Sequence, residues 1–113
     1  MHLQVVFHVD EPEKWGLLLR NLQNLLRSSD AAAAAIEVVA NGPAVSFYKV
    51  GRTDAVEHLQ SLSKAGVRFC VCENALRGMK ISPTELLPFV QTVPSGVLEL
   101  IWCQNHGFAY LKP

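Results

Sequence analysis

Short apolar segments alternate with longer amphipathic segments along the whole chain. Five short segments have the length and residue content of strands, and most are nearly continuous runs of Val, Ile, Phe or Leu. They are residues 3–9, 36–40, 67–71, 91–93 and 108–111. Strands that alternate with helical segments predict a parallel sheet with helices on both faces, which is an α/β fold.

Capping residues and turn residues predict where the helices between these strands begin and end. Expected helices run from about residue 11 to 28, from 43 to about 50, from Thr53 or Asp54 to 66, and from Ser95 to 107. Residues 29–35 fit either a helical extension or an irregular connection. Capping residues are expected at three starts: Asp10 with Glu13, Ser82 with Glu85, and Ser95 with Gly96.

The last helix carries apolar residues at positions i, i+3 and i+4, namely Leu98, Ile101 and Trp102, and this stripe is expected to face the core. Glu99, Cys103 and His106 fall on the opposite side. A Cys–His pair suits nucleophilic catalysis. A solvated polar face is the favoured interpretation of this group, with catalysis as the alternative.

Composition predicts one domain over residues 1–113. The chain has 10 basic and 10 acidic residues and a formal net charge of zero, so no nucleic-acid partner is expected. Charged residues make up only 18%, against roughly 25% in an average domain. This shortage predicts burial of some surface against other subunits, although an unusually apolar monomer also fits.

Location is predicted from the termini, the apolar runs and the cysteines. The N-terminus shows no signal-peptide pattern, and no apolar run is long enough to span a bilayer, so neither secretion nor membrane insertion is expected. The three cysteines are an odd number, which argues against a disulfide framework. A reducing cytoplasm is therefore predicted.

Reactive and ligand-binding groups of parallel sheets collect at the carboxyl ends of the strands. Residues at these ends, or just after them, are the candidates: His8, Asn41, Gly42, Cys72, Asn74, Arg77, Ser95 and Gly96. Cys72 is the most reactive candidate, because backbone N–H groups at the following turn favour a thiolate and Arg77 adds positive charge. The alternative is a buried, inert cysteine.

The other candidates each have a plain structural interpretation. His8 is either a satisfied structural histidine or an acid–base group, and the Asn41-Gly42 and Ser95-Gly96 turns are either weak anion sites or ordinary caps. Cys70 is expected to pack in the core. No metal site and no cofactor are expected, because the CxC pair has no second ligand pair nearby and the four histidines are scattered.

Four segments together resemble the DsrE/DsrF-like family, also called the YchN-like family. They are VVFHVDEPEKW, IEVVANGPAV, GVRFCVCENALRGMKI and SGVLELIWCQNHGFAYLKP. The resemblance implies a three-layer α/β/α sandwich around a mostly parallel five-stranded sheet, and a homotrimer or a hexamer of two trimers. Some relatives relay sulfur as a persulfide, in sulfur oxidation and in thiolation of transfer RNA. Their cysteine matches Cys72, and Asn74 and Arg77 match the same segment.

The sequence thus predicts a cytoplasmic homo-oligomer that carries or relays sulfur on Cys72, with a sulfur-donor or sulfur-acceptor protein as a further partner. The first alternative is a non-enzymatic binding or scaffold protein in which Cys72 is structural and an anion or metabolite occupies the edge. The second alternative is a small enzyme that uses Cys103 and His106.

Overall fold

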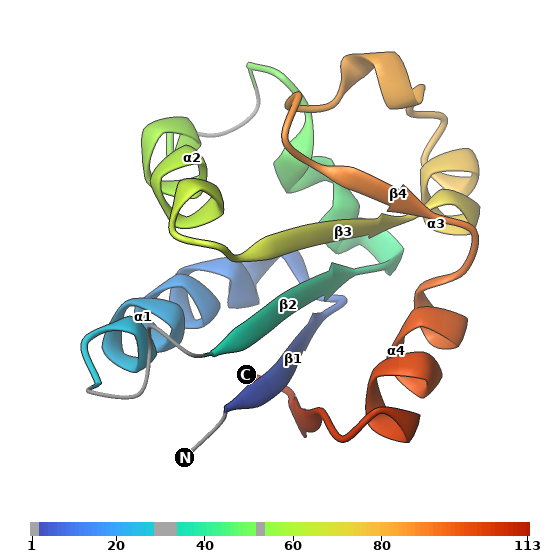
Figure 1. The fold of residues 1–113 in the computed structure, drawn as a ribbon. Helices are drawn as coiled ribbons and strands as arrows, with labels where there is room; N and C mark the ends of the chain where they lie inside the picture. Colours follow the sequence, from blue (N-terminus) through green and yellow to red (C-terminus); the bar gives the residue numbers. More distant parts are fainter. Residues whose placement is uncertain (1–2, 29–33, 52–53) are drawn as a thin grey trace.

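A computed structural model describes residues 3–28, 34–51 and 54–113 of the protein. Its centre is a five-stranded sheet in the order β4-β3-β2-β1-β5, and every neighbouring pair is parallel (Figure 1). The strands are β1 (Gln4–Val9), β2 (Ala35–Ala40), β3 (Arg68–Cys72), β4 (Gln91–Val93) and β5 (Ala109–Leu111). The α/β fold and all five expected strands are confirmed.

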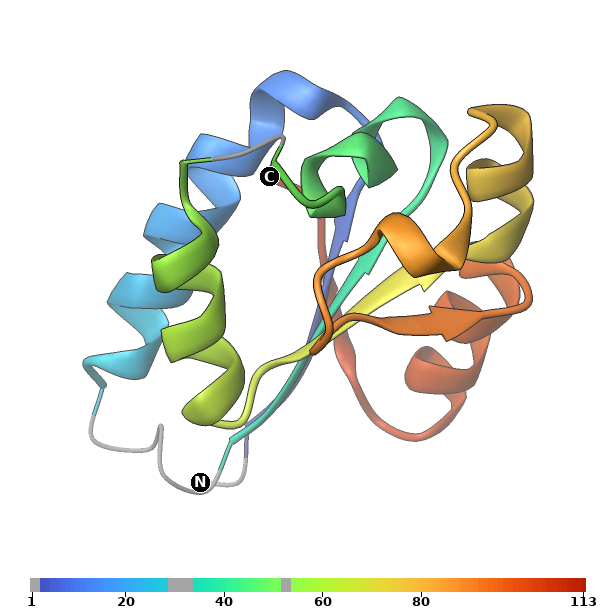
Figure 2. The same cartoon turned by 90° about the horizontal axis from the view of Figure 1, so that it is seen from above.

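Helices cover both faces of this sheet and form three layers. Viewed along the sheet, α1 and α2 lie on one face and α4 lies on the other (Figure 2). The α-helices are α1 (Trp15–Leu26), α2 (Val56–Lys64), α3 (Glu73–Gly78) and α4 (Gly96–Asn105). Short 3-10 helices are η1 (Pro12–Lys14), η3 (Gly42–Tyr48) and η4 (Pro83–Glu85). Within the described segments, every helix falls short of the length and apolar character needed to cross a membrane.

Two hydrophobic cores flank the sheet because side chains alternate between its faces along each strand. The larger core lies under α1 and α2 and includes the fully buried Trp15, Tyr48 and Phe69. The smaller core lies under α4. Its members are Val6, Val39, Cys70, Val93, Leu100 and Cys103. Cys70 therefore packs in a core, as expected.

The helix starts agree only in part with the sequence. Ser82 forms the expected capping box with Glu85, and Ser95 Oγ accepts from the Leu98 backbone N–H at 3.3 Å. The capping box at Asp10 was wrong: the cap position before η1 is Glu11, with no side-chain cap. Asp10 Oδ2 instead accepts from Lys112 Nζ at 3.1 Å, because β5 lies beside β1.

Two expected boundaries also shift. The first long helix is shorter than predicted and ends at Leu26. Helix α2 begins at Val56, and Thr53, one of the two predicted starts, lies outside the described residues. Residues 29–33 of the predicted link lie outside them as well, while Ala35 already belongs to β2.

Helix α4 faces the sheet with the side opposite to the one predicted. Leu98, Ile101 and Trp102 are 48–63% exposed, whereas Leu100 and Cys103 are buried. The prediction failed because Cys103 and Glu99 find polar partners beneath the helix. These partners are Glu37 on β2 and Arg68 on β3. Once its polar groups are paired inside, the helix can turn its large apolar residues outward.

Candidate site at the carboxyl edge of the sheet

Four side chains form a row across four neighbouring strands, on the α4 face of the sheet. Tyr110 on β5 is in register with Val6, and Val6, Val39 and Cys70 belong to the core under α4. Strand alternation places His8, Asn41 and Cys72, each two residues further on, on this same face. The β2–β3 register pairs Ala40 with Val71, so Asn41 follows beside Cys72. The row runs Tyr110, His8, Asn41, Cys72.

Hydrogen bonds connect three members of this row. His8 Nε2 lies 2.9 Å from Asn41 Oδ1, and His8 Nδ1 lies 2.6 Å from the Tyr110 hydroxyl. The carboxamide oxygen can only accept, so Nε2 carries a hydrogen and donates to it. In neutral His8, Nδ1 then accepts from the Tyr110 hydroxyl. His8 is thus a part-buried histidine with both ring nitrogens bonded.

Cys72 lies where the end of β3, the start of α3 and the first turn of α4 meet. Its side chain is 6% exposed, and it occupies the cap position of α3. Gly96 of α4 packs against it: a Cβ atom on Gly96 would lie 3.3 Å from Cys72 Cβ, 3.2 Å from Asn41 Cβ and 3.4 Å from Asn41 Nδ2. The absent side chain of Gly96 therefore lets Asn41 and Cys72 come close beneath the N-terminus of α4.

The remaining predicted site residues divide into two groups. Gly42 lies at this edge with φ +55°, a left-handed conformation that suits glycine, and Ser95 caps α4. Asn74 and Arg77 are exposed on α3, and the Arg77 guanidinium donates to the Asn74 carboxamide oxygen. The structure thus brings His8, Asn41, Gly96 and Cys72 together, while the Asn74–Arg77 pair faces solvent.

A second polar cluster lies under α4, nearer the start of the strands. Arg68 donates to Glu37 Oε1 at 2.9 Å and to Glu99 Oε2 at 3.3 Å. The Cys103 thiol donates to Glu37 Oε2 at 3.3 Å. Glu37 is not among the residues predicted from the sequence, where its only signal is one carboxylate inside an otherwise apolar strand. It is 4% exposed, and its charge is paired, as burial demands.

Burial and this cluster keep the thiols of Cys70 and Cys103 protonated. Burial, followed by the Glu37 carboxylate, raises the pKa of Cys103 to about 12. The same two causes raise the pKa of Cys70 further. His106 stacks on Trp102 and its Nδ1 contacts the Trp102 carbonyl at 2.7 Å, away from the Cys103 partners. The expectation of a solvated Cys103 was wrong, and its buried thiol does not form the Cys–His pair.

Among the residues that the structure describes, the same cluster also brings together a set of possible metal ligands. Glu37, Cys70 and Glu99 each offer a ligand atom within 4.8 Å of the others. Carboxylate and thiolate together suit a borderline metal such as zinc. The Arg68 guanidinium, however, already supplies a positive charge to both carboxylates. The donor set is therefore explained as a buried ion-pair cluster.

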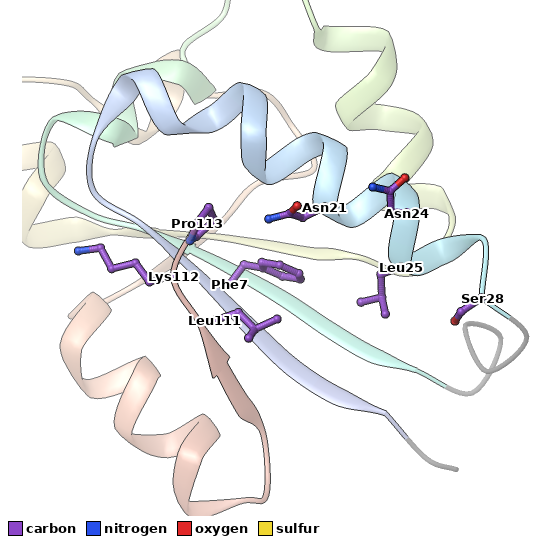
Figure 3. Close-up of a pocket in the computed structure, with 8 residues that line it drawn as sticks. All are labelled: Phe7, Asn21, Asn24, Leu25, Ser28, Leu111, Lys112 and Pro113. Atoms are coloured by element: carbon purple, nitrogen blue, oxygen red, sulfur yellow. The ribbon is translucent and has the colours of Figure 1, made fainter.

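A cavity of about 490 Å³ opens on the other face of the sheet, between α1 and β5 (Figure 3). Phe7 and Leu111 line it from the sheet, and Leu25, Asn21 and Asn24 line it from α1. Lys112 also lines it, but its ammonium group is paired with Asp10. The cavity lies across the sheet from Cys72, and none of its lining residues is a cysteine.

Comparison with known proteins identifies the family. A model of the DsrE/DsrF-like family matches residues 5–113. The chain belongs to this family. Among curated proteins, none matches the sequence at a significant level. The expected DsrE/DsrF-like membership is thereby confirmed.

Two solved structures are similar to this DsrE/DsrF-like chain over their whole length. A protein of unknown function, MTH1491 from Methanobacterium thermoautotrophicum, is 34% identical with a TM-score of 0.88, covering 98% of this chain and 99% of that one. The ychN protein from E. coli is 17% identical with a TM-score of 0.83 and the same coverage. Both likenesses support the three-layer fold.

Proposed function

We propose that this DsrE/DsrF-like protein is a cytoplasmic sulfur carrier that holds a persulfide on Cys72. The observation that carries the proposal is the position of this thiol. Cys72 stands at the carboxyl edge of β3, where the sulfur-relay relatives place their cysteine. Burial and the Glu37 carboxylate keep Cys103 protonated, and also Cys70, which lies two residues before Cys72 on β3.

The proposed reaction moves one sulfur atom without net oxidation. The Cys72 thiolate attacks the outer sulfur of a donor persulfide, the donor's S–S bond breaks, and the donor leaves as a thiolate. Cys72 then carries the sulfur as a persulfide. An acceptor thiolate attacks that outer sulfur in turn, which regenerates the Cys72 thiolate and leaves the persulfide on the acceptor.

The donor class is either a small sulfane-sulfur compound or a partner protein that carries a persulfide. The low exposure of Cys72, 6%, favours a small donor in the free chain, because a protein-borne sulfur needs a wider approach. The same low exposure supports a second candidate function, a binding or scaffold protein in which Cys72 only packs against Gly96.

Intact mass after incubation with inorganic polysulfide separates these candidates. We expect the native, reduced protein to gain the mass of one sulfur atom, with loss of the adduct on reduction. Cys72→Ser should gain nothing, whereas the matched control Cys103→Ser should load normally and keeps a hydroxyl to donate to Glu37.

Iodoacetamide labelling of the same samples tests access. Cys72 should react before Cys70 and Cys103, which are both fully buried. No adduct on folded protein, or equal loading of Cys72→Ser, contradicts loading from a small donor. A persulfide-bearing protein offered as donor in a parallel sample tests the other route, and failure of both leaves the binding or scaffold role.

A further inference from the structure

The row of side chains that ends at Cys72 has a fixed hydrogen-bond direction. The Tyr110 hydroxyl donates to His8 Nδ1, and His8 Nε2 donates to Asn41 Oδ1. Protonation of His8 leaves the second bond unchanged, because Nε2 donates in both charge states. The Asn41 carboxamide therefore has its oxygen occupied, and its orientation is set from outside.

The free end of that carboxamide is its NH2 group, which lies on the Cys72 side. A Cβ atom placed on Gly96 would lie 3.4 Å from Asn41 Nδ2 and 3.3 Å from Cys72 Cβ, so these two atoms flank the same position. An NH2 group can donate two hydrogen bonds and accept none. A donor of this kind within reach of a cysteine sulfur stabilises the anionic form of the sulfur more than the neutral form.

We infer that Asn41 is the hydrogen-bond donor to the anionic sulfur of Cys72, and that His8 and Tyr110 are positioning residues that hold its NH2 group there. This inference deepens the proposed function and rests on it for its biological meaning. Tyr110 acts across the sheet, from the last strand of the chain.

The pH profile of Cys72 alkylation by iodoacetamide tests the inference without any sulfur donor. Asn41→Asp keeps an oxygen for His8 but replaces the NH2 group by a second oxygen. Loss of a charge-assisted hydrogen bond and the new negative charge act in the same direction, so alkylation at neutral pH should slow about tenfold or more and the profile should shift up by about one pH unit or more. Tyr110→Phe removes only the positioning hydroxyl and should slow alkylation about threefold.

Lys112→Met is the matched control, because it breaks the other side-chain tie between β5 and the end of β1 and leaves His8 untouched. It should alkylate like the parent protein. Equal slowing in Tyr110→Phe and Lys112→Met would assign the effect to strand docking and overturn the inference. The inference would also be overturned if Asn41→Asp and Tyr110→Phe both showed the alkylation profile of the parent protein. Since Tyr110 is 39% exposed, its variant tests the inference even if Asn41→Asp fails to fold.

The two proposals fail in different ways. Shifted alkylation profiles without any persulfide adduct, from either class of donor, would sink the sulfur-carrier role and keep the Asn41 assignment. A persulfide adduct on Cys72, with unshifted alkylation profiles in both variants, would support the sulfur-carrier role and overturn the Asn41 assignment.

Discussion

The ring of Tyr48 packs in the core while its hydroxyl group is buried without a hydrogen-bond partner among the described residues. Its ring is fully buried and meets Trp15 and Phe69 edge-on, with ring centroids 5.1 and 6.1 Å away. Burial of the hydroxyl raises the pKa of Tyr48 well above its usual value. A buried hydroxyl that loses water and gains no partner destabilises the folded state.

We therefore expect Tyr48→Phe to raise the free energy of unfolding by about 1 kcal/mol. Urea denaturation followed by circular dichroism measures this change. Tyr110→Phe is the control, because its hydroxyl is hydrogen-bonded to His8 and its loss should bring no gain. A Tyr48→Phe protein that is clearly less stable would show that the hydroxyl has a partner.

The packing of helix α4 on the sheet involves a buried cluster of charged side chains. One guanidinium, Arg68, faces the carboxyls of Glu37 and Glu99. Because one positive charge balances one carboxylate, the second carboxyl is favoured as the acid. A hydrogen bond with Glu37, together with burial, raises the pKa of Glu99 to about 7. The docking of α4 on the sheet is thus stabilised by a proton.

This proton predicts a pH dependence of stability. The folded protein retains it up to a pKa of about 7, whereas the unfolded chain loses it near 4.5. The stabilisation of the folded state by this proton is therefore complete below pH 4.5 and is lost as the pH rises through 7. The free energy of unfolding should fall by on the order of 1 kcal/mol, a small amount because solvent screens the partly exposed cluster.

Glu99→Gln should remove this loss between pH 4.5 and 7, because the amide does not titrate. Urea midpoints across that pH range measure the effect. The exposed Glu57→Gln on α2 is the matched control and should keep the parental slope. A Glu99→Gln protein with the parental slope would place the titrating group elsewhere.

At the scale of the whole molecule, the outer face of α4 remains apolar. Val97, Leu98, Ile101 and Trp102 are 48–63% exposed. An exposed apolar surface of this kind marks an interaction site. From this face and the low charge content, we propose that the protein is a homo-oligomer, a trimer or a hexamer, that buries the outer face of α4.

Light scattering after size exclusion measures the assembly. We expect the parent protein to elute as an oligomer and Leu98→Lys to shift toward the monomer, because the new charge would be buried at the interface. Val50→Lys replaces an equally exposed apolar residue outside α4 and should leave the mass unchanged. A monomeric parent protein, or an unchanged mass for Leu98→Lys, would contradict burial of this face.

Local patterns in the sequence determined the elements and the edge where chemistry is placed. Short runs of branched apolar residues predict the strands, and serine caps at Ser82 and Ser95 predict two helix starts. Because parallel strands end at one edge, the sequence also predicts that His8, Asn41 and Cys72 lie along the same edge of the sheet, without telling which strands are neighbours. These inferences succeed because each rests on residues a few positions apart.

The tertiary structure alone decided which distant polar groups meet. Placing β5 beside β1 brings Tyr110 to His8 and Lys112 to Asp10, each 102 residues away along the chain. Stacking α4 on β2 and β3 pairs Cys103 with Glu37 and turns Leu98 outward. Helical periodicity could not reveal this, since a polar residue may face the core whenever another strand supplies its partner.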